Sequence, residues 1–128
     1  MLSFCMSDIE GSTTLWERHP EAMSEALRRH DDLIAAVVEA HRGRLLKSMG
    51  EGDSTVSVFA SAPAAVRAAI EAAHAIDAEP WPAGLHIRAR FGLHTGKAQR
   101  RGGDYFGSTV NRAARVQKIG RASCRERV

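Results

Sequence analysis

The stretch that decides the fold is Leu2–Glu17, LSFCMSDIEGSTTLWE. It opens with a short apolar run that ends at Asp8, a pattern typical of a β-strand with a carboxylate at its tip. Gly11 and hydroxyl residues follow, and the spacing Thr14-x-x-Glu17 predicts a capping box at the start of a helix. The chain therefore begins with a strand, a tight turn and a helix, and the later elements are expected to pack around this first strand.

The size and composition of the chain are those of a single globular domain. It has 128 residues, of which 44% are hydrophobic and 26% charged, so a disordered chain is excluded. No apolar run reaches the roughly 18–20 residues that a membrane span needs, and no signal peptide is visible, which predicts a cytoplasmic protein without a membrane partner. The net charge is only +3, and the last ten residues carry three arginines against one glutamate. We therefore expect no nucleic-acid partner.

The last residues differ from the rest of the chain. The segment 119–128, IGRASCRERV, has neither an apolar period nor helix-capping residues, and it resembles the translation of a common sequencing adaptor. We predict that the native domain covers residues 1–117 and that residues 118–128 are a non-native tail. Outside that tail Cys5 is the one thiol, and its place in an apolar run indicates a reducing compartment without disulfides.

Between the first strand and the tail, the sequence predicts two further helices with apolar faces. Pro20 suits the first position of a long helix that Gly43 ends. A second helix is predicted over 61–79, with Pro63 in its first turn. The apolar residues near helical spacing are Met23, Leu27, Leu33, Ile34, Val37 and Val38 in the first helix, and Val66, Ala69, Ile70 and Ala73 in the second.

Three further strands are predicted to complete a sheet. Residues 44–59 indicate a hairpin with its turn at 50–52, and residues 85–94, LHIRARFGLH, alternate as in a strand with one solvated face. A glycine turn at Gly102-Gly103 and a helix from about Thr109 follow. This order predicts an α+β domain with a ferredoxin-like βαββαβ layout, in which helices pack on one face of a mainly antiparallel sheet.

Acidic residues at two predicted turns are the first candidates for chemistry. Asp8 stands at a strand tip beside a helix start, a combination that suits a hard cation together with phosphate. The hairpin turn carries Glu51 and Asp53 on either side of Gly52. Two strand-tip carboxylates repel each other unless a cation lies between them, which favours two-metal chemistry. The structural alternatives are an ordinary helix cap and a polar hairpin turn.

The final predicted helix carries a second candidate pair. Asn111 and Arg115 are four residues apart, so both project from one helix face. Arginine is suited to phosphate charge, and asparagine can orient a sugar or a base edge. The alternative is a solvated polar stripe.

Three segments in order resemble the successive motifs of the class III nucleotidyl cyclases, in particular the bacterial adenylate cyclase catalytic domain. They are FCMSDIEGSTTLWE (4–17), HRGRLLKSMGEGDSTVSVF (41–59) and FGLHTGKAQRRGGDYFGSTVNRAAR (91–115). The resemblance covers Leu2 to about Gln117 and implies the palm fold of these cyclases. Because the family's domain continues with further strands, the resemblance also implies a fold that is incomplete at its C-terminus.

The resemblance implies a metal site at the acidic residues. Asp8 would be a ligand of two Mg²⁺ or Mn²⁺ ions, with the Ile9 carbonyl assisting one of them and a hairpin carboxylate completing the pair. The hairpin is two residues longer than the family pattern. Alignment on the residues before the turn assigns the second carboxylate to Glu51, whereas alignment on the following strand assigns it to Asp53. We favour Asp53, because this alignment keeps the family's Gly-Asp pair, and Glu51 remains the alternative.

The resemblance further implies the substrate and the assembly. Lys47 and Asp104 match the residues that read the adenine edge of ATP, and Asn111 and Arg115 match the pair that acts in the transition state. Domains of this family associate head to tail as homodimers. Each site then takes its metal ligands from one chain and the other four residues from its partner.

The expected activity is that of an adenylate cyclase, which converts ATP into 3′,5′-cyclic AMP and pyrophosphate. A guanylate or diguanylate cyclase is one alternative, the latter suggested by GGDYF at 102–106. A non-catalytic cyclase-like module for regulation or dimerisation is the other. Because the fold is expected to be incomplete, we predict that the 128-residue chain by itself is poorly stable or inactive.

Overall fold

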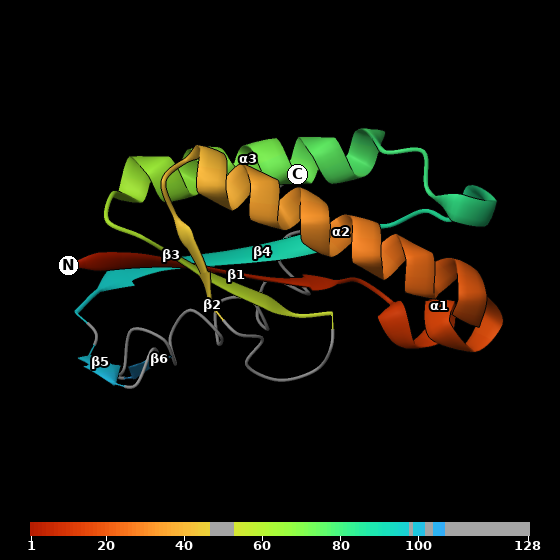
Figure 1. Ribbon diagram of the computed structural model, residues 1–128, viewed down its shortest axis with the longest axis horizontal. Helices are drawn as coiled ribbons and strands as arrows, with labels where there is room; N and C mark the ends of the chain where they lie inside the picture. The colour runs from red at the N-terminus through yellow and green to blue at the C-terminus, as the bar shows by residue number, and fades with distance from the viewer. Residues whose placement is uncertain (47–52, 98, 102–103, 107–128) are drawn as a thin grey trace, which may run out of the picture.

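The computed structural model describes residues 1–46, 53–97, 99–101 and 104–106, and for the last two segments the backbone alone (Figure 1). The elements are, in chain order, β1 (Leu2–Ile9), α1 (Ser12–Arg18), α2 (Pro20–Ala40), β2 (Arg44–Leu46), β3 (Thr55–Phe59), α3 (Ala62–Ala78), the short 3-10 helix η1 (Pro82–Gly84), β4 (Ala89–Gly96), β5 (Gln99–Arg101) and β6 (Asp104–Phe106). The predicted final helix and the turn at 50–52 lie outside the described residues. No described helix combines the length and the apolar character that crossing a bilayer requires.

The main sheet has four strands in the order β2-β3-β1-β4, and every neighbouring pair is antiparallel. Helices α2 and α3 lie across one face of this sheet (Figure 1). Strands β5 and β6 form a separate two-stranded ribbon. The predicted α+β class, with helices on one face of an antiparallel sheet, is therefore confirmed.

The alternation along β1 separates two apolar clusters, one on each face of the sheet. Cys5 and Ile9 face the helices and pack with residues of α2 and α3. Phe4 and Met6 face the opposite side, where Leu46, Val56 and Val58 complete a second buried cluster. Asp8 has the parity of Phe4 and Met6, so its carboxylate belongs to the face away from the helices.

The alternating segment before and within β4 was placed correctly by its sequence pattern. Ile87 is buried in the helix-side cluster, and Phe91 and Leu93 of β4 pack against that cluster. The regular strand begins at Ala89, four residues later than the start of the alternating pattern.

The start of α1 differs from the prediction. The helix begins at Ser12, and the preceding Gly11 has φ 67° with no side-chain cap. Thr14 therefore lies inside the helix, and the predicted capping box is wrong. The left-handed conformation of Gly11 reverses the chain directly after β1, so the helix begins before the position at which a Thr14 cap could act.

The end of α2 also differs from the prediction. The helix starts at Pro20 as expected but ends at Ala40, and Arg42 takes the left-handed position with φ 61°. Gly43 N–H donates to Val38 O at 2.8 Å and Arg42 N–H to Glu39 O at 3.0 Å, the two bonds of a Schellman motif. Glycine is required at position 43 for a different reason: a Cβ there would lie 2.3 Å from the Phe59 ring.

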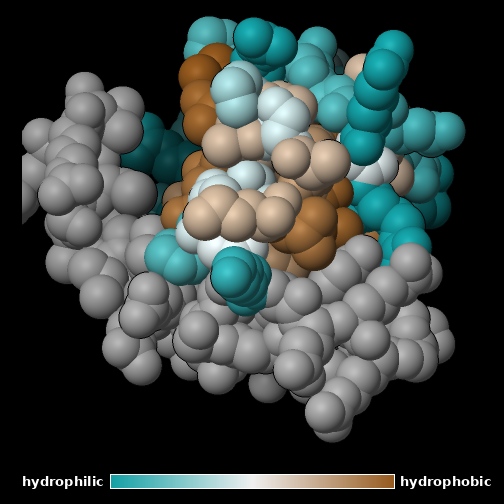
Figure 2. Space-filling model, turned by 90° about the vertical axis from the view of Figure 1, so that its left-hand side faces the viewer, coloured by the Kyte–Doolittle hydropathy of each residue, from teal (hydrophilic) through white to brown (hydrophobic). Residues whose placement is uncertain are grey.

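Helix α3 buries Ala69 as predicted, but the rest of its buried face differs from the prediction. Its buried residues are Ala65, Ala68, Ala69, Ala72 and Ile76. Val66 and Ile70 are instead 47% and 54% exposed. The small alanines allow the helix to approach the sheet and α2 closely, so available space and not side-chain hydrophobicity selects the buried face. Figure 2 views the end of the molecule at which α3 begins, where apolar residues are visible among hydrophilic ones.

The two ends of α3 are fixed by polar contacts. Ser61 caps the first turn by accepting a hydrogen bond from Ala64 N–H at 3.3 Å. Beyond the last turn, the Trp81 indole N–H donates to Ile76 O at 2.9 Å, and Arg29 of α2 lies over the Trp81 ring while pairing with Glu79. These contacts hold α3 and the segment that leads into β4 against α2.

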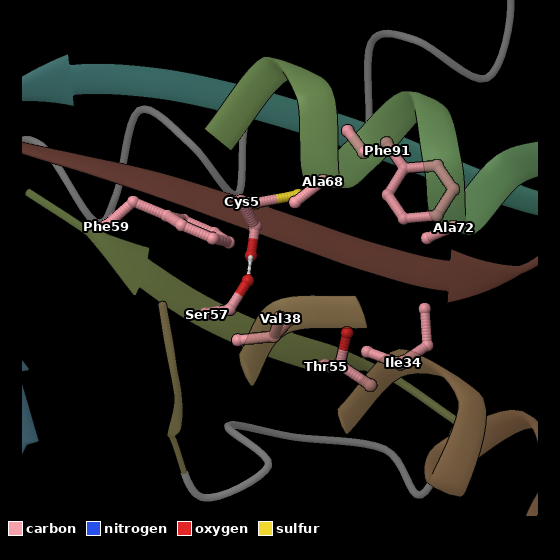
Figure 3. Close-up of a pocket in the computed structure, with 10 residues that line it drawn as sticks. Cys5, Ile34, Val38, Thr55, Ser57, Phe59, Ala68, Ala72 and Phe91 are labelled. Carbon is pink, nitrogen blue, oxygen red and sulfur yellow. Dashed lines mark hydrogen bonds between the residues drawn. The ribbon is translucent and has the colours of Figure 1, made fainter. Parts of the chain in front are cut away.

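Cys5 lines a small pocket between β1 and the helices, with Ser57 and Phe91 among its neighbours (Figure 3). Its sulfur points towards α3 beside Ala68, while its carbonyl accepts a hydrogen bond from the Ser57 hydroxyl at 3.4 Å (Figure 3). Burial raises the pKa of the Cys5 thiol to about 12, although a hydrogen bond with Ser57 acts in the opposite direction.

Substitutions at Arg42 and Gly43 are expected to change stability in opposite directions. Gly43→Ala should lower the free energy of unfolding by roughly 2–3 kcal/mol, because the new methyl group overlaps the Phe59 ring. Arg42→Gly should raise it by about 0.5–1 kcal/mol, because the left-handed strain that glycine relieves exceeds the extra backbone entropy that glycine loses on folding. Urea denaturation of both variants measures the difference. Equal destabilisation by both changes would contradict this account of the helix end.

The Cys5 thiol should be protected from reagents in the folded protein. With Cys124→Ser removing the only other thiol, Ellman's reagent should react about 10³-fold more slowly at pH 8 than with the urea-unfolded chain, because the thiolate fraction falls tenfold for each unit by which the pKa rises. The rate at which Ellman's reagent labels Cys5 in the folded protein should also fall when the fold is stabilised. Equal labelling rates in the folded and unfolded protein would contradict the buried position of Cys5.

Candidate active site

The candidate site lies where one end of β1 meets the first residues of β3 and β4. Because β1 is antiparallel to both neighbours, its C-terminal end lies beside their N-terminal ends. Asp8 is opposite Arg90 of β4 in the register, and Ser7 is opposite Thr55, the first residue of β3. The Ser7 and Thr55 hydroxyl groups are hydrogen-bonded, which ties the two strands together at this end.

Asp53 reaches β1 from the loop that precedes β3. The Ile9 backbone N–H donates to Asp53 Oδ2 at 3.3 Å. This bond places the Asp53 carboxylate next to the residue that follows Asp8, although the two aspartates are 45 positions apart in the sequence. The juxtaposition that the sequence analysis expected, of a hairpin carboxylate with the end of the first strand, is present at Asp53.

Asp8 is held by an arginine that the sequence analysis did not select. Arg90 Nε donates to Asp8 Oδ1 at 2.7 Å, and Arg90 Nη2 donates to Asp8 Oδ2 at 2.6 Å. The side chains are only 11% exposed for Arg90 and 25% for Asp8. A two-point contact with this little solvent is among the stronger kinds of protein ion pair.

A sequence signal for Arg90 did exist but was incomplete. The alternation in 85–94 assigns Arg90 to the face opposite Phe91 and Leu93, which was expected to be solvated. Its partner depends on the β1–β4 register, in which Asp8 faces Arg90. A hydrophobic pattern specifies which face a residue occupies, but it does not specify which residue lies across from it.

The donor chemistry of this corner fits a hard divalent cation. Asp8 and Asp53 offer carboxylate oxygens, and Asp53 Oδ1 has no hydrogen bond within the described part of the chain. The described residues contain no group of three acidic, histidine or cysteine side chains that could hold a metal by itself. Mg²⁺ is usually bound by one or two carboxylates together with water and substrate phosphates, so two aspartates meet its needs when a phosphate is also bound.

The other predicted site residues are not placed by the described structure. Asp104 is the first residue of β6, where the backbone alone is described and pairs with Arg101. Lys47, Glu51, Asn111 and Arg115 lie outside the described residues. The structure therefore brings Asp8, Ile9 and Asp53 together, and the roles of all eight predicted site residues stay predictions.

Relatives among curated proteins share most of this chain but extend well beyond it. An uncharacterized protein of Mycobacterium tuberculosis is 36% identical over 118 residues, which cover 92% of this chain and 39% of that protein. A receptor-type adenylate cyclase of Trypanosoma equiperdum is 30% identical over 161 aligned residues, which cover 93% of this chain and 34% of that protein. The adenylate cyclase of Schizosaccharomyces pombe is 27% identical, over 92% of this chain and 8% of its own length.

Solved structures of cyclases have the same fold. A Trypanosoma brucei adenylate cyclase in its monomeric state superposes with a TM-score of 0.84 at 25% identity, covering 92% of this chain and 68% of that one. A bacterial light-regulated adenylyl cyclase superposes with a TM-score of 0.76 at 21% identity, covering 94% of this chain and 70% of that one. The second likeness supports the fold alone because its sequence identity is low.

The family model called adenylate and guanylate cyclase catalytic domain matches residues 2–124, almost the whole chain. The order of strands and helices, the antiparallel sheet and the curated relatives agree with that match. The chain belongs to the family of class III adenylate and guanylate cyclase catalytic domains.

Proposed function

We propose that this chain is the catalytic domain of an adenylate cyclase, which converts ATP into 3′,5′-cyclic AMP and pyrophosphate. The observation that carries the proposal is the meeting of Asp8 and Asp53 at the end of β1, in a chain of the cyclase family. Curated relatives from fission yeast and trypanosomes that bear the name adenylate cyclase support the choice of ATP. We place the reaction in the cytoplasm.

The base preference is assigned to Lys47 and Asp104. Adenine presents an acceptor at N1 and a donor at its 6-amino group, so a lysine donor and an aspartate acceptor complement it. Guanine presents the opposite pattern at the same positions, which makes GTP the poorer substrate. The two side chains therefore act on substrate choice and not on the bond-making step.

The reaction is an in-line displacement at the α-phosphorus. The 3′-oxygen of ATP forms a bond to that phosphorus, its proton passes to solvent, and the bond from the α-phosphorus to the bridging oxygen breaks to release pyrophosphate. Asn111 orients the ribose, and Arg115 stabilises the negative charge that spreads over the phosphate oxygens in the transition state.

Metal binding is assigned to the end of β1. The Asp8 and Asp53 carboxylates and the Ile9 carbonyl would hold two Mg²⁺ or Mn²⁺ ions, with Glu51 as the alternative to Asp53. When bound, such ions lower the pKa of the 3′-hydroxyl and neutralise phosphate charge. The hydrogen bond from the Ile9 N–H orients the Asp53 carboxylate and leaves Oδ1 available as a ligand atom.

The active unit is proposed to be a head-to-tail homodimer. The ligands Asp8, Ile9 and Asp53 come from one chain, while Lys47, Asp104, Asn111 and Arg115 come from its partner. The Asp8 carboxylate belongs to the face of the sheet opposite to α2 and α3, so these two helices do not stand between the site and a partner chain.

Single substitutions should identify the metal ligands. Asp8→Asn and Asp53→Asn should each lower kcat at least about 100-fold in the full-length gene product, assayed with ATP and Mg²⁺ or Mn²⁺, because a ligand of the cations is lost. Glu51→Gln is the matched control and should retain most activity. A large loss in Glu51→Gln with little loss in Asp53→Asn would reverse the assignment. If the unsubstituted protein forms neither cyclic AMP nor cyclic GMP with either metal, a non-catalytic module is favoured.

Mixing two inactive variants should restore activity if the sites are shared. Asp8→Asn and Arg115→Ala chains are each expected to be inactive as homodimers. In a mixed dimer one site carries both changes and the other carries neither, so random pairing should return about a quarter of the wild-type activity. The measurement is cyclic AMP formation after co-refolding in equal amounts. No recovery, with mixed dimers demonstrated by tag pull-down, would contradict shared sites.

A further inference from the structure

We propose that Arg90 is the counter-ion of Asp8 in the metal-free protein and competes with the divalent cation for that carboxylate. The inference rests on the proposed metal site, because it concerns how that site is kept in order before a cation arrives. It makes Arg90 a positioning residue that sets the metal affinity of the site.

Arg90 engages both carboxylate oxygens of Asp8. Arg90 donates to both of them, through Nε at 2.7 Å and Nη2 at 2.6 Å. A cation that binds either oxygen in the direction now taken by the guanidinium must displace at least one of these hydrogen bonds. Asp53 differs, because its hydrogen bond from Ile9 N–H engages Oδ2 and leaves Oδ1 without a partner in the described residues. Asp8 is therefore the ligand whose availability is controlled.

Arg90 also balances negative charge at the proposed metal site. Asp8 and Asp53 meet at one corner of the sheet, and the Arg90 guanidinium is in direct contact with one of the two carboxylates. Two like charges at one corner repel each other unless a positive charge lies near them. Arg90 thus allows the end of β1 to form in the absence of metal, and the same contact opposes the binding of metal.

The guanidinium of Arg90 has the position and the shape for a two-point contact with Asp8. The Arg90 side chain is 11% exposed and starts from the second residue of β4, directly across from Asp8. The planar guanidinium fork matches both carboxylate oxygens, whereas a lysine ammonium would contact them as a single point. A substitution by lysine therefore keeps the charge and removes the two-point contact, which separates the two contributions experimentally.

Mn²⁺ binding in the absence of nucleotide tests the proposal without recourse to activity. Free Mn²⁺ is measured by electron paramagnetic resonance during titration of the full chain. Arg90→Met should bind Mn²⁺ at least about tenfold more tightly than the wild type, because the competitor is gone, and Arg90→Lys should lie between the two. Arg88→Gln is the matched control: Arg88 is exposed, lies two positions away, and its Nε donates to His86, so the Mn²⁺ affinity of this variant should stay within about twofold of the wild type.

Thermal unfolding provides a second readout. Without metal, Arg90→Met should melt at a lower temperature than the wild type, because Asp8 is left unpaired. Saturating Mn²⁺ should raise the melting temperature of this variant by more than it raises that of the wild type. A residue with a merely structural role would lower both temperatures equally. If Arg90→Met does not fold, Arg90→Lys provides the same comparison in binding and in melting.

The outcomes separate this inference from the proposed function. Loss of Mn²⁺ binding in Asp8→Asn together with unchanged or weaker binding in folded Arg90 variants overturns the competition while the metal site stands. Unchanged Mn²⁺ binding in Asp8→Asn overturns the metal site itself, and the competition with it. An equal gain in Mn²⁺ affinity for Arg90→Met and Arg88→Gln would show that removal of either positive charge has the same effect. That result would also overturn the proposal.

Discussion

The central position of β1 in the sheet is the constraint on which the other features depend. Antiparallel pairing on both sides brings the starts of β3 and β4 to the same end of β1, so Asp53 and Arg90 meet Asp8 there. A slip of one residue would exchange the two faces of the strand, moving Asp8 to the helix side and Cys5 and Ile9 to the opposite side. The two apolar clusters therefore hold the acidic corner in register as well as stabilising the sheet.

The same corner shows why a binding site and a stable sheet make opposing demands. Carboxylates gathered to hold cations destabilise the fold when the cations are absent, since like charges with little solvent between them repel. An arginine in direct contact relieves this cost at Asp8, and the structure contains that contact. Removing one partner of such a pair costs more than the pair contributes, because the other charge remains partly buried and unpaired.

Much of the fold could be predicted from the sequence, because β1 is an apolar run and α2 and β4 have periodic patterns that specify a face. The pattern could not specify the partner across the sheet, so the contact of Arg90 with Asp8 was missed, while the role of Asp8 and Asp53 as metal ligands stays a prediction. The errors at α1 and α2 arose from backbone conformation: Gly11 replaced a side-chain cap, and Arg42 took the left-handed position expected of glycine. In α3 the hydrophobicity of Val66 and Ile70 was misleading, since packing space favoured alanine. Lys47, Glu51, Asn111 and Arg115 lie outside the described residues and stay predictions, as does the side-chain role of Asp104.

The alanine face of α3 has a consequence for how this helix is held. Alanine loses no rotamer freedom on burial, so the face forms without the entropic cost that leucine or methionine would carry. Alanine side chains are also too short to interlock with neighbouring side chains, so they oppose movement of the helix along its axis only weakly. The axial position of α3 is then set at its two ends, by the Ser61 cap and by Trp81 with Arg29.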